Sequence, residues 1–144
     1  MSQNDCGSDG SLTFMVRKVW LGMRASIGEV LADFDLTSSQ YATLMMTQGE
    51  PGMSVADIAR NVGSTRQAAN EMLGTLEKAG LIERQPHPTD RRTHQIHVTD
   101  AGRAVYRKAD AAVVRREAEL EAAFTPAQRA AVRAWLTGMA DACR

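Results

Sequence analysis

The sequence lacks the features that mark membrane, disulfide-rich and metal-binding proteins. No apolar run approaches the roughly 18–20 residues of a membrane-spanning helix. Two cysteines, Cys6 and Cys143, lie near opposite ends of the chain, which argues against a disulfide framework and a zinc knuckle. The small, polar residues 1–11 contain no apolar signal segment. We therefore expect a cytoplasmic protein that requires no cofactor and no metal and does not associate with membranes.

Net charge is also absent, because 17 lysines and arginines balance 17 acidic residues. Bulk charge alone gives no indication of a nucleic-acid partner. The distribution is uneven, however: residues 60–108 hold nine basic and five acidic residues, whereas residues 1–59 hold three basic and seven acidic ones. The excess positive charge thus lies in the middle of the chain, where a surface that faces phosphates would need it.

Apolar residues at steps of three and four predict six helices, the first beginning at Leu12. Capping residues mark the start of each later helix: Thr37 with Gln40, Ser54 with Asp57 in the first turn, Ser64 with Gln67, Thr99 with Asp100, and Thr125 with Gln128. Gly63 is predicted to supply the turn between the third and fourth helices, and Gly80 to end the fourth. The fifth helix is expected to reach about Ala123.

Between the fourth and fifth helices, the segments 81–85 and 94–98 predict a two-stranded hairpin with an arginine-rich tip. The expected fold is mainly α with a small β-hairpin wing, a winged helix-turn-helix. We expect a tail over residues 1–11, a helical dimerisation region over 12–36 and 100–144, and a winged helix-turn-helix lobe over 37–99. The terminal helices have apolar faces with few partners within one chain, which predicts a homodimer; the alternative is a monomer that folds them onto its own centre.

The second helix of the predicted helix-turn-helix presents a polar face that is suited to duplex DNA. In this motif, the N-terminal part of the second helix contacts base edges in the major groove. Arg66 could contact guanine, and Gln67 or Asn70 could contact adenine. Ser64 and Thr65 lie where hydroxyls and free backbone N–H groups would meet a phosphate. The alternative is an ordinary solvated helix face.

The tip of the hairpin contains Asp90, Arg91 and Arg92. A narrow minor groove concentrates negative potential and attracts inserted arginine. Asp90 could hold one arginine in a fixed orientation while another contacts phosphate. Taken alone, the same residues would also fit a solvated turn.

Several stretches together resemble the MarR family of bacterial winged helix-turn-helix regulators. They are Leu76–Arg84, Asp90-Arg91-Arg92, Val98–Gly102 and Leu36–Tyr41. The resemblance extends over roughly residues 12–142. It implies a homodimeric transcriptional regulator, most often a repressor, whose terminal helices intertwine. It also implies that the helix carrying Ser64–Asn70 enters a major groove, and that Asp90 and Arg92 belong to a wing that reaches the adjacent minor groove.

The resemblance further implies release from DNA by a small aromatic or phenolic acid, bound between the dimer helices and the DNA-binding lobe. The candidate residues for this effector are Trp20, Met23, Arg24, Tyr41 and Met45. Methionine adapts to ligands of different shape, tryptophan offers a stacking face, and Arg24 could meet a carboxylate. The spacing of Trp20, Met23 and Met45 is also that of core residues.

Three other functions are weighed against this one. An oxidant sensor could use Cys6 or Cys143, but no basic residue flanks Cys6 to lower the pKa of its thiol. A winged-helix module could bind protein in place of DNA. An enzyme is not expected, because no nucleophile–base pair, carboxylate dyad or phosphate loop is visible. The histidines His87, His94 and His97 of the hairpin are expected to be solvated.

Overall fold

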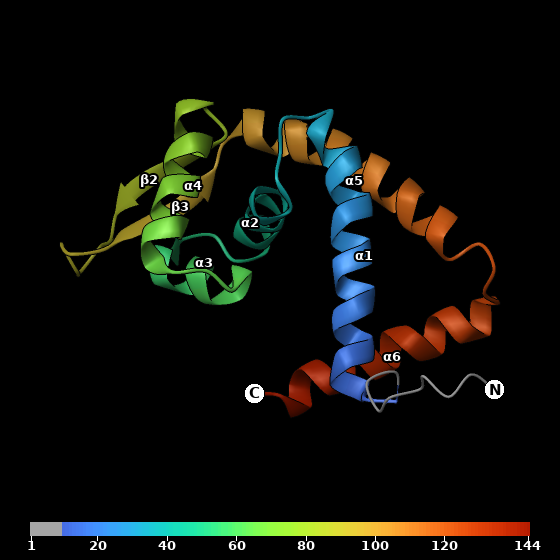
Figure 1. Ribbon diagram of the computed structural model, residues 1–144. Helices are drawn as coiled ribbons and strands as arrows, with labels where there is room; N and C mark the ends of the chain where they lie inside the picture. The colour runs from blue at the N-terminus through green and yellow to red at the C-terminus, as the bar shows by residue number, and fades with distance from the viewer. Residues whose placement is uncertain (1–9) are drawn as a thin grey trace.

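The computed structural model describes residues 10–144, which form six helices and three short strands (Figure 1). In chain order they are α1 (Leu12–Ala32), α2 (Ser38–Gly49), β1 (Met53–Ser54), α3 (Val55–Val62), α4 (Arg66–Lys78), β2 (Ile82–Pro86), β3 (His94–Val98), α5 (Asp100–Leu120) and α6 (Pro126–Ala142). The mainly helical fold with a small wing is therefore confirmed. Among the described helices, none is both long and apolar enough to cross a membrane.

Most predicted helix starts are confirmed by side-chain caps. The predicted capping boxes at Thr37 and Thr125 are both formed, and Ser54 forms a third with Asp57. In each, the cap hydroxyl accepts from the backbone N–H three residues later, and that residue's side chain accepts from the cap's own N–H. Helix α5 ends at Leu120, and not near Ala123 as expected, because a turn closed by the N–H of Phe124 on the carbonyl of Glu121 follows it.

One predicted cap is wrong. The structure begins α4 at Arg66 and caps it with Thr65, whose hydroxyl accepts from the N–H of Ala68 at 3.1 Å. Ser64 instead belongs to the turn that ends α3: its N–H donates to the carbonyl of Ala59, and its hydroxyl donates to the carbonyl of Thr65. That turn passes through Gly63 with φ of 67°, a conformation that glycine adopts without strain.

The predicted hairpin is present as β2 and β3, and a short additional strand, β1, completes a three-stranded antiparallel sheet in the order β1-β3-β2. The additional strand pairs Met53 with Ile96 and Ser54 with Gln95. Two residues are too few to show a period, which explains why the sequence pattern did not reveal this strand. The pairing fixes the wing to the start of α3 as well as to the end of α4.

The base of the wing is closed where β3 meets α5. The hydroxyl of Thr99 donates to the carbonyl of Gly80 at 2.6 Å, and its N–H donates to the carbonyl of Leu81 at 3.1 Å. Gly102, one turn into α5, lies so close to Leu81 that an added Cβ would be 2.1 Å from its carbonyl oxygen. The end of α4 and the start of α5 are therefore in direct backbone contact.

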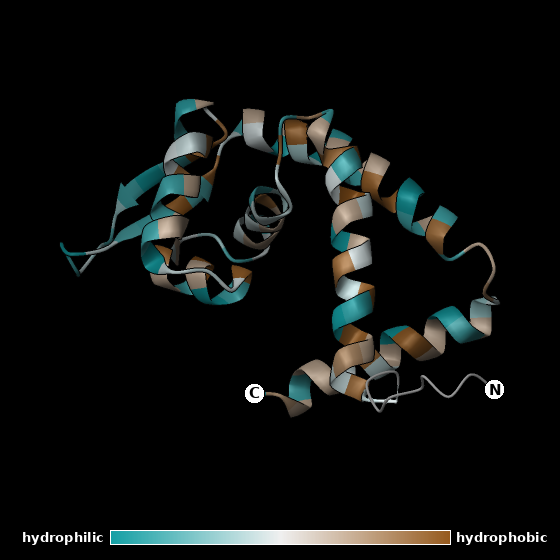
Figure 2. Ribbon diagram, in the orientation of Figure 1, coloured by the Kyte–Doolittle hydropathy of each residue, from teal (hydrophilic) through white to brown (hydrophobic). Residues whose placement is uncertain are grey.

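The core lies in the lobe formed by α2, α3, α4 and the sheet, and it is closed on one side by α5 and the end of α1. Its fully buried members include Leu31, Leu44, Ile58, Leu73 and Ile96. Helix α6, by contrast, has no buried residue. Apolar residues recur along α1 and α6 (Figure 2), and many of their side chains are exposed. Figure 1 shows α1, α5 and α6 as the three sides of a triangle beside the lobe, with α1 and α5 also packed against α2.

Candidate nucleic-acid interface

Helix α4 buries one face and exposes the other at its N-terminal end. Ala69, Leu73 and Leu76 are buried in the lobe, whereas Arg66 and Gln67 are exposed. The first backbone N–H groups of a helix have no partner within the helix, and they carry the positive end of its dipole. The first turn of α4 therefore combines a guanidinium, an amide and free N–H groups, a set that suits base edges and phosphate oxygens.

Ser64 and Thr65 are committed to the turn and the cap that precede α4. Ser64 is half-buried and its hydroxyl donates to the carbonyl of Thr65 at 3.1 Å, while the Thr65 hydroxyl accepts from the N–H of Ala68. Both hydroxyls thus serve the local backbone first, although Thr65 remains exposed. The sequence pattern placed both residues correctly at the helix start, but it did not reveal that their hydroxyls are hydrogen-bonded to the local backbone.

Asn70 lies on the same exposed face, but its side chain is bound by Arg84 of strand β2. The guanidinium donates from Nη1 to Oδ1 of Asn70 at 2.9 Å and from Nη2 to the backbone carbonyl of Asn70 at 3.1 Å. Nε of Arg84 lies 3.7 Å from a carboxylate oxygen of Glu77, two turns further along α4. Arg84 was not among the predicted site residues, because its partners are 14 and seven positions away in sequence.

The tip of the wing is organised by side chains that bind its backbone. Oδ1 of Asp90 accepts from the N–H of Arg92 at 3.0 Å and lies 3.4 Å from Nε of the same residue. The predicted contact between Asp90 and an arginine is therefore present. The side chain of Arg92 is nevertheless 91% exposed, and Arg91 beside it is also exposed. Two guanidiniums are thus presented to solvent at the outermost part of the lobe.

His87 has a structural role that the sequence did not reveal. Its Nδ1 accepts from the backbone N–H groups of Thr89 at 3.2 Å and of Asp90 at 3.0 Å, so the expectation of a solvated ring is wrong. His97 also departs from that expectation, because its Nε2 is buried without a hydrogen-bond partner, whereas His94 is exposed. Within residues 10–144, no group of three or more potential metal ligands is present.

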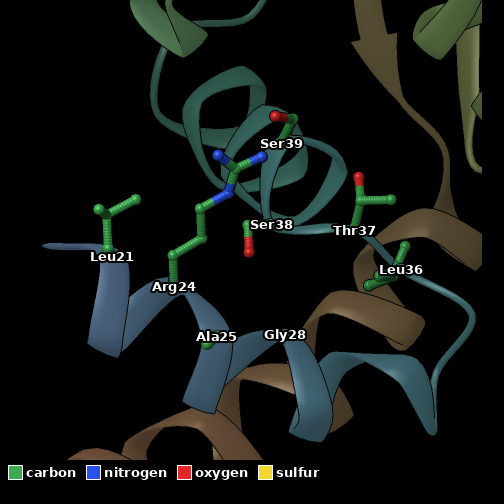
Figure 3. Close-up of a pocket in the computed structure, with 8 residues that line it drawn as sticks. All are labelled: Leu21, Arg24, Ala25, Gly28, Leu36, Thr37, Ser38 and Ser39. Atoms are coloured by element: carbon green, nitrogen blue, oxygen red, sulfur yellow. The ribbon is translucent and has the colours of Figure 1, made fainter.

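A cleft of about 490 Å³ separates α1 from the start of α2 (Figure 3). The guanidinium of Arg24 extends from α1 across this cleft toward the hydroxyl of Ser39. Leu21, Ala25 and Leu36 contribute apolar atoms to the lining. The cleft thus pairs one cation and the hydroxyls of the first turn of α2 with an apolar wall, an arrangement that suits a small organic anion.

A second cleft, of about 340 Å³, continues from the first toward the helix-turn-helix. Arg24, Thr37 and Ser39 line both clefts, and the second is also lined by Ser64 and by residues of α4. A molecule that filled both would therefore contact α1 and α4 at once.

The five predicted effector residues do not form one site. Only Arg24 lines the clefts beside α2, whereas Met23 lines a separate cavity of about 540 Å³ between α1, α5 and α6. Trp20 and Met45 are exposed. Tyr41 is buried, stacked on Tyr106 with ring centroids 5.3 Å apart. Sequence spacing could not separate these surroundings, because all five positions fit an amphipathic helix.

Tyr41 connects the lobe to α5. Its hydroxyl donates to Oδ1 of Asp110 at 2.6 Å, and the hydroxyl of Tyr106 lies 3.4 Å from the same oxygen. Burial, and then the hydrogen bond to Asp110, raises the pKa of Tyr41 far above its ordinary value. The side chain is therefore a neutral hydrogen-bond donor within the packed seam between α2 and α5.

The two cysteines differ in what the structure describes. Cys143 is a free, exposed thiol at the end of α6. Cys6 lies outside the described residues.

Comparison with known proteins identifies the family. A family model described as MarR family matches residues 34–93. The HTH-type transcriptional repressor Rv2887 of Mycobacterium tuberculosis is 31% identical over 121 residues, which cover 84% of this chain and 87% of that protein. The chain belongs to the MarR family. A putative transcriptional regulatory protein for the hcr operon of Thauera aromatica is 26% identical over 83% of this chain and 73% of its own length.

Solved structures of MarR proteins have the same fold. The transcriptional repressor CouR, bound to a 23-mer DNA duplex, matches with a TM-score of 0.84 and 28% identity over 97% of this chain and 99% of its own. The Mycobacterium tuberculosis protein Rv2887, in complex with salicylic acid, matches with a TM-score of 0.78 and 28% identity over 92% and 98% of the two chains. The winged helix-turn-helix and the recognition of the MarR family from sequence are therefore confirmed.

Proposed function

We propose that this MarR-family protein is a homodimeric repressor that binds a pseudo-palindromic DNA operator. The observation that carries the proposal is the joint exposure of Arg66 and Gln67 at the start of α4 and of two arginines at the wing tip. A helix start can enter a major groove while arginine enters the neighbouring minor groove. The DNA duplex bound by CouR, a relative of the same fold, supports this assignment.

Dimerisation is part of the proposal. Exposed apolar residues on α1 and α6 include Val19, Trp20, Val132, Trp135 and Leu136. A second copy related by twofold symmetry would bury the same surface on both chains. Under this proposal, residues 12–36 and 100–144 form the dimerisation region and residues 37–99 the DNA-binding lobe. The dimer would then present two recognition helices to half-sites about one helical turn, ~10 bp, apart.

The test is selection of bound duplexes from a random library by the purified protein at ~150 mM salt. Enrichment of an inverted repeat with half-sites about one turn apart supports a dimeric operator reader. Binding that is weak, salt-sensitive and without sequence preference would overturn it, and would favour a winged-helix module that binds protein.

We also propose that a small aromatic carboxylate binds in the cleft beside Arg24 and thereby releases the DNA. The cleft has a cation, hydroxyls and an apolar wall, and its continuation reaches Ser64 and α4. The carboxylate of a ligand there would form an ion pair with the guanidinium of Arg24. The bound ligand would alter the position of α4 relative to α1. The complex of Rv2887 with salicylic acid supports this class of effector. Of the five effector residues predicted from sequence, only Arg24 belongs to this site.

Titration with salicylate, benzoate and 4-hydroxybenzoate tests the effector site. Release of the selected operator by at least one acid is expected in the wild type. Arg24→Gln should raise the concentration needed by about tenfold, because a charge-assisted pair is lost. Arg17→Gln, on the exposed part of the same helix, is the matched control. Equal sensitivity of Arg24→Gln and wild type would place the ligand elsewhere.

A further inference from the structure

We infer that Arg84 determines which base Asn70 reads, by fixing its amide with the oxygen toward the arginine and the N–H groups turned away from it. The inference rests on the proposed DNA-binding role of α4. It assigns a specificity-determining role to a residue that does not itself face the DNA, since the side chain of Arg84 is only 21% exposed.

The orientation of the Asn70 amide follows from the chemistry of its partner. A guanidinium has five N–H donors and no acceptor, so only the oxygen of the amide can face it favourably. Nη1 of Arg84 lies 2.9 Å from this oxygen, which leaves Nδ2 as the amide atom that the arginine does not bind, on a residue that is exposed. A freely rotating asparagine could turn either atom outward, but this one cannot without losing a charge-assisted hydrogen bond.

The arginine is itself fixed at several points. Nη2 donates to the backbone carbonyl of Asn70 at 3.1 Å, and Nε lies 3.7 Å from Glu77. Asn70 and Glu77 are seven residues apart and so lie on the same side of α4, two turns from each other. Arg84 projects from β2, where it is paired with Ile96 in the sheet. The wing sheet thus holds the guanidinium along α4.

The orientation of the Asn70 amide decides which base edge it can read. Adenine is read by asparagine through two bonds, one that the amide oxygen accepts from N6 and one that the amide nitrogen donates to N7. With its oxygen held toward Arg84, Asn70 cannot turn that oxygen to adenine N6 without losing this bond, and it offers its two N–H donors, which suit the O6 and N7 acceptors of guanine. Asn70 is therefore a guanine reader, in contrast to the adenine contact that its residue type alone suggests.

The experiment is the random-library selection applied to a set of variants. Asn70→Ala should lose preference at one position of each half-site, which identifies the base pair that Asn70 faces. In the wild type, this position should favour guanine over adenine by about five- to a hundredfold. Arg84→Met, which retains an unbranched apolar stem without donors, should shift the preference toward adenine and leave the other positions unchanged.

Two further variants separate specificity from stability. Glu77→Gln removes the charge beside Nε of Arg84 but leaves the bonds from Nη1 and Nη2 to Asn70, so guanine should still be preferred. The double variant Asn70→Ala with Arg84→Met should match Asn70→Ala alone at the identified position, since the two residues act through one contact. A purely structural role for Arg84 would weaken binding at all positions equally.

The outcomes distinguish this inference from the proposed function. No enriched sequence for the wild type would overturn DNA reading itself. An enriched operator in which Asn70 faces adenine, or in which Asn70→Ala changes no position, would overturn only the inference. An unchanged guanine preference in Arg84→Met would do the same. If Arg84→Met fails to fold, Asn70→Asp provides the test, because an aspartate has no donor and should lose the preference for guanine.

Discussion

The lobe and the terminal helices of this chain differ in how completely one copy buries them. In the lobe, Ile58, Leu73 and Ile96 have no exposed surface, and each belongs to one continuous core. In α6, Trp135 remains 42% exposed and no residue is buried. Burial of apolar area is the main driving force of folding, so the lobe has most of its stabilisation within one chain. The terminal helices gain comparable stabilisation only when a second surface covers their apolar residues.

The strongest test of this contrast is to place a charge on the apolar face of α6. Leu136→Glu should convert the proposed dimer to a monomer, because a carboxylate would be buried without a partner. Loss of the second half-site should weaken operator binding by about a hundredfold or more. Sedimentation and a titration of the operator measure the two effects. Ala134→Glu, on the opposite face, should change neither, and a dimeric Leu136→Glu protein would refute the assignment of the interface.

The lobe should instead be sensitive to a single added methyl group at its junction with α5. The Cβ of Gly102→Ala would lie 2.1 Å from the carbonyl oxygen of Leu81 and 2.7 Å from Cγ2 of Val98. Because backbone must move to accommodate it, we expect a loss of about 3 kcal/mol or more in the free energy of unfolding. Urea denaturation measures this loss.

Gly74→Ala is the matched control for that substitution. It adds the same methyl group within α4, where nothing lies within 4 Å. It should raise the free energy of unfolding by up to about 1 kcal/mol, because alanine favours helix over glycine. Similar effects of the two substitutions would show that the contact between Gly102 and Leu81 is not tight.

The seam between the two regions can be tested by removing one hydroxyl. Tyr41→Phe loses the bond to Asp110 and should cost roughly 1.5–3 kcal/mol at neutral pH, as expected for a bond to a charged acceptor. Burial and Asp110 raise the pKa of Tyr41, so its stabilising effect is complete below the unfolded pKa of about 10 and is lost as pH rises above it.

Urea titrations at pH 7 and pH 11 measure the predicted pH dependence. The difference in stability between wild type and Tyr41→Phe should shrink at the higher pH. The hydroxyl of Tyr106 lies at the longer distance of 3.4 Å from Oδ1 of Asp110, so Tyr106→Phe should reduce the free energy of unfolding less than Tyr41→Phe does at pH 7. A difference that stays constant with pH would contradict a neutral Tyr41 in the folded state.

The smallest effect on folding is expected at the wing tip. Arg92→Ala removes an exposed side chain and should leave the free energy of unfolding within about 0.5 kcal/mol of wild type. It should reduce the slope of operator affinity against salt by about one per wing, because a cation near the phosphates is lost. Arg103→Ala, an exposed arginine of α5, serves as the control. A salt slope equal to that of wild type would remove the wing from the interface.

Much of the fold could be predicted from local sequence patterns. The capping boxes at Thr37 and Thr125 act over three residues, and so they are visible in the sequence. Gly63 and Gly80 have the positive φ angles that a turn after a helix requires. The choice between Ser64 and Thr65 as cap was wrong, since it depends on how α3 ends, which no capping pattern within α4 encodes.

The candidate site was predictable only in part. The polar residues at the start of α4 and the arginines of the wing follow from the order of elements. The bond from Arg84 to Asn70 joins a strand to a helix 14 residues earlier, so no periodic pattern within either element encodes it. The effector residues could not be assigned for a similar reason: Met23 and Arg24 are neighbours in sequence, yet they line different cavities on different sides of α1.

The closure at Thr99 has a consequence for how such a protein can diverge. Because Thr99 is hydrogen-bonded to Gly80 and Leu81, the wing hairpin begins and ends at nearly the same point. Residues inserted or deleted at the tip between β2 and β3 would lengthen or shorten the wing and leave α4 and α5 in place. Operator recognition at the wing could therefore evolve by changes in loop length, independently of the helices that assemble the protein.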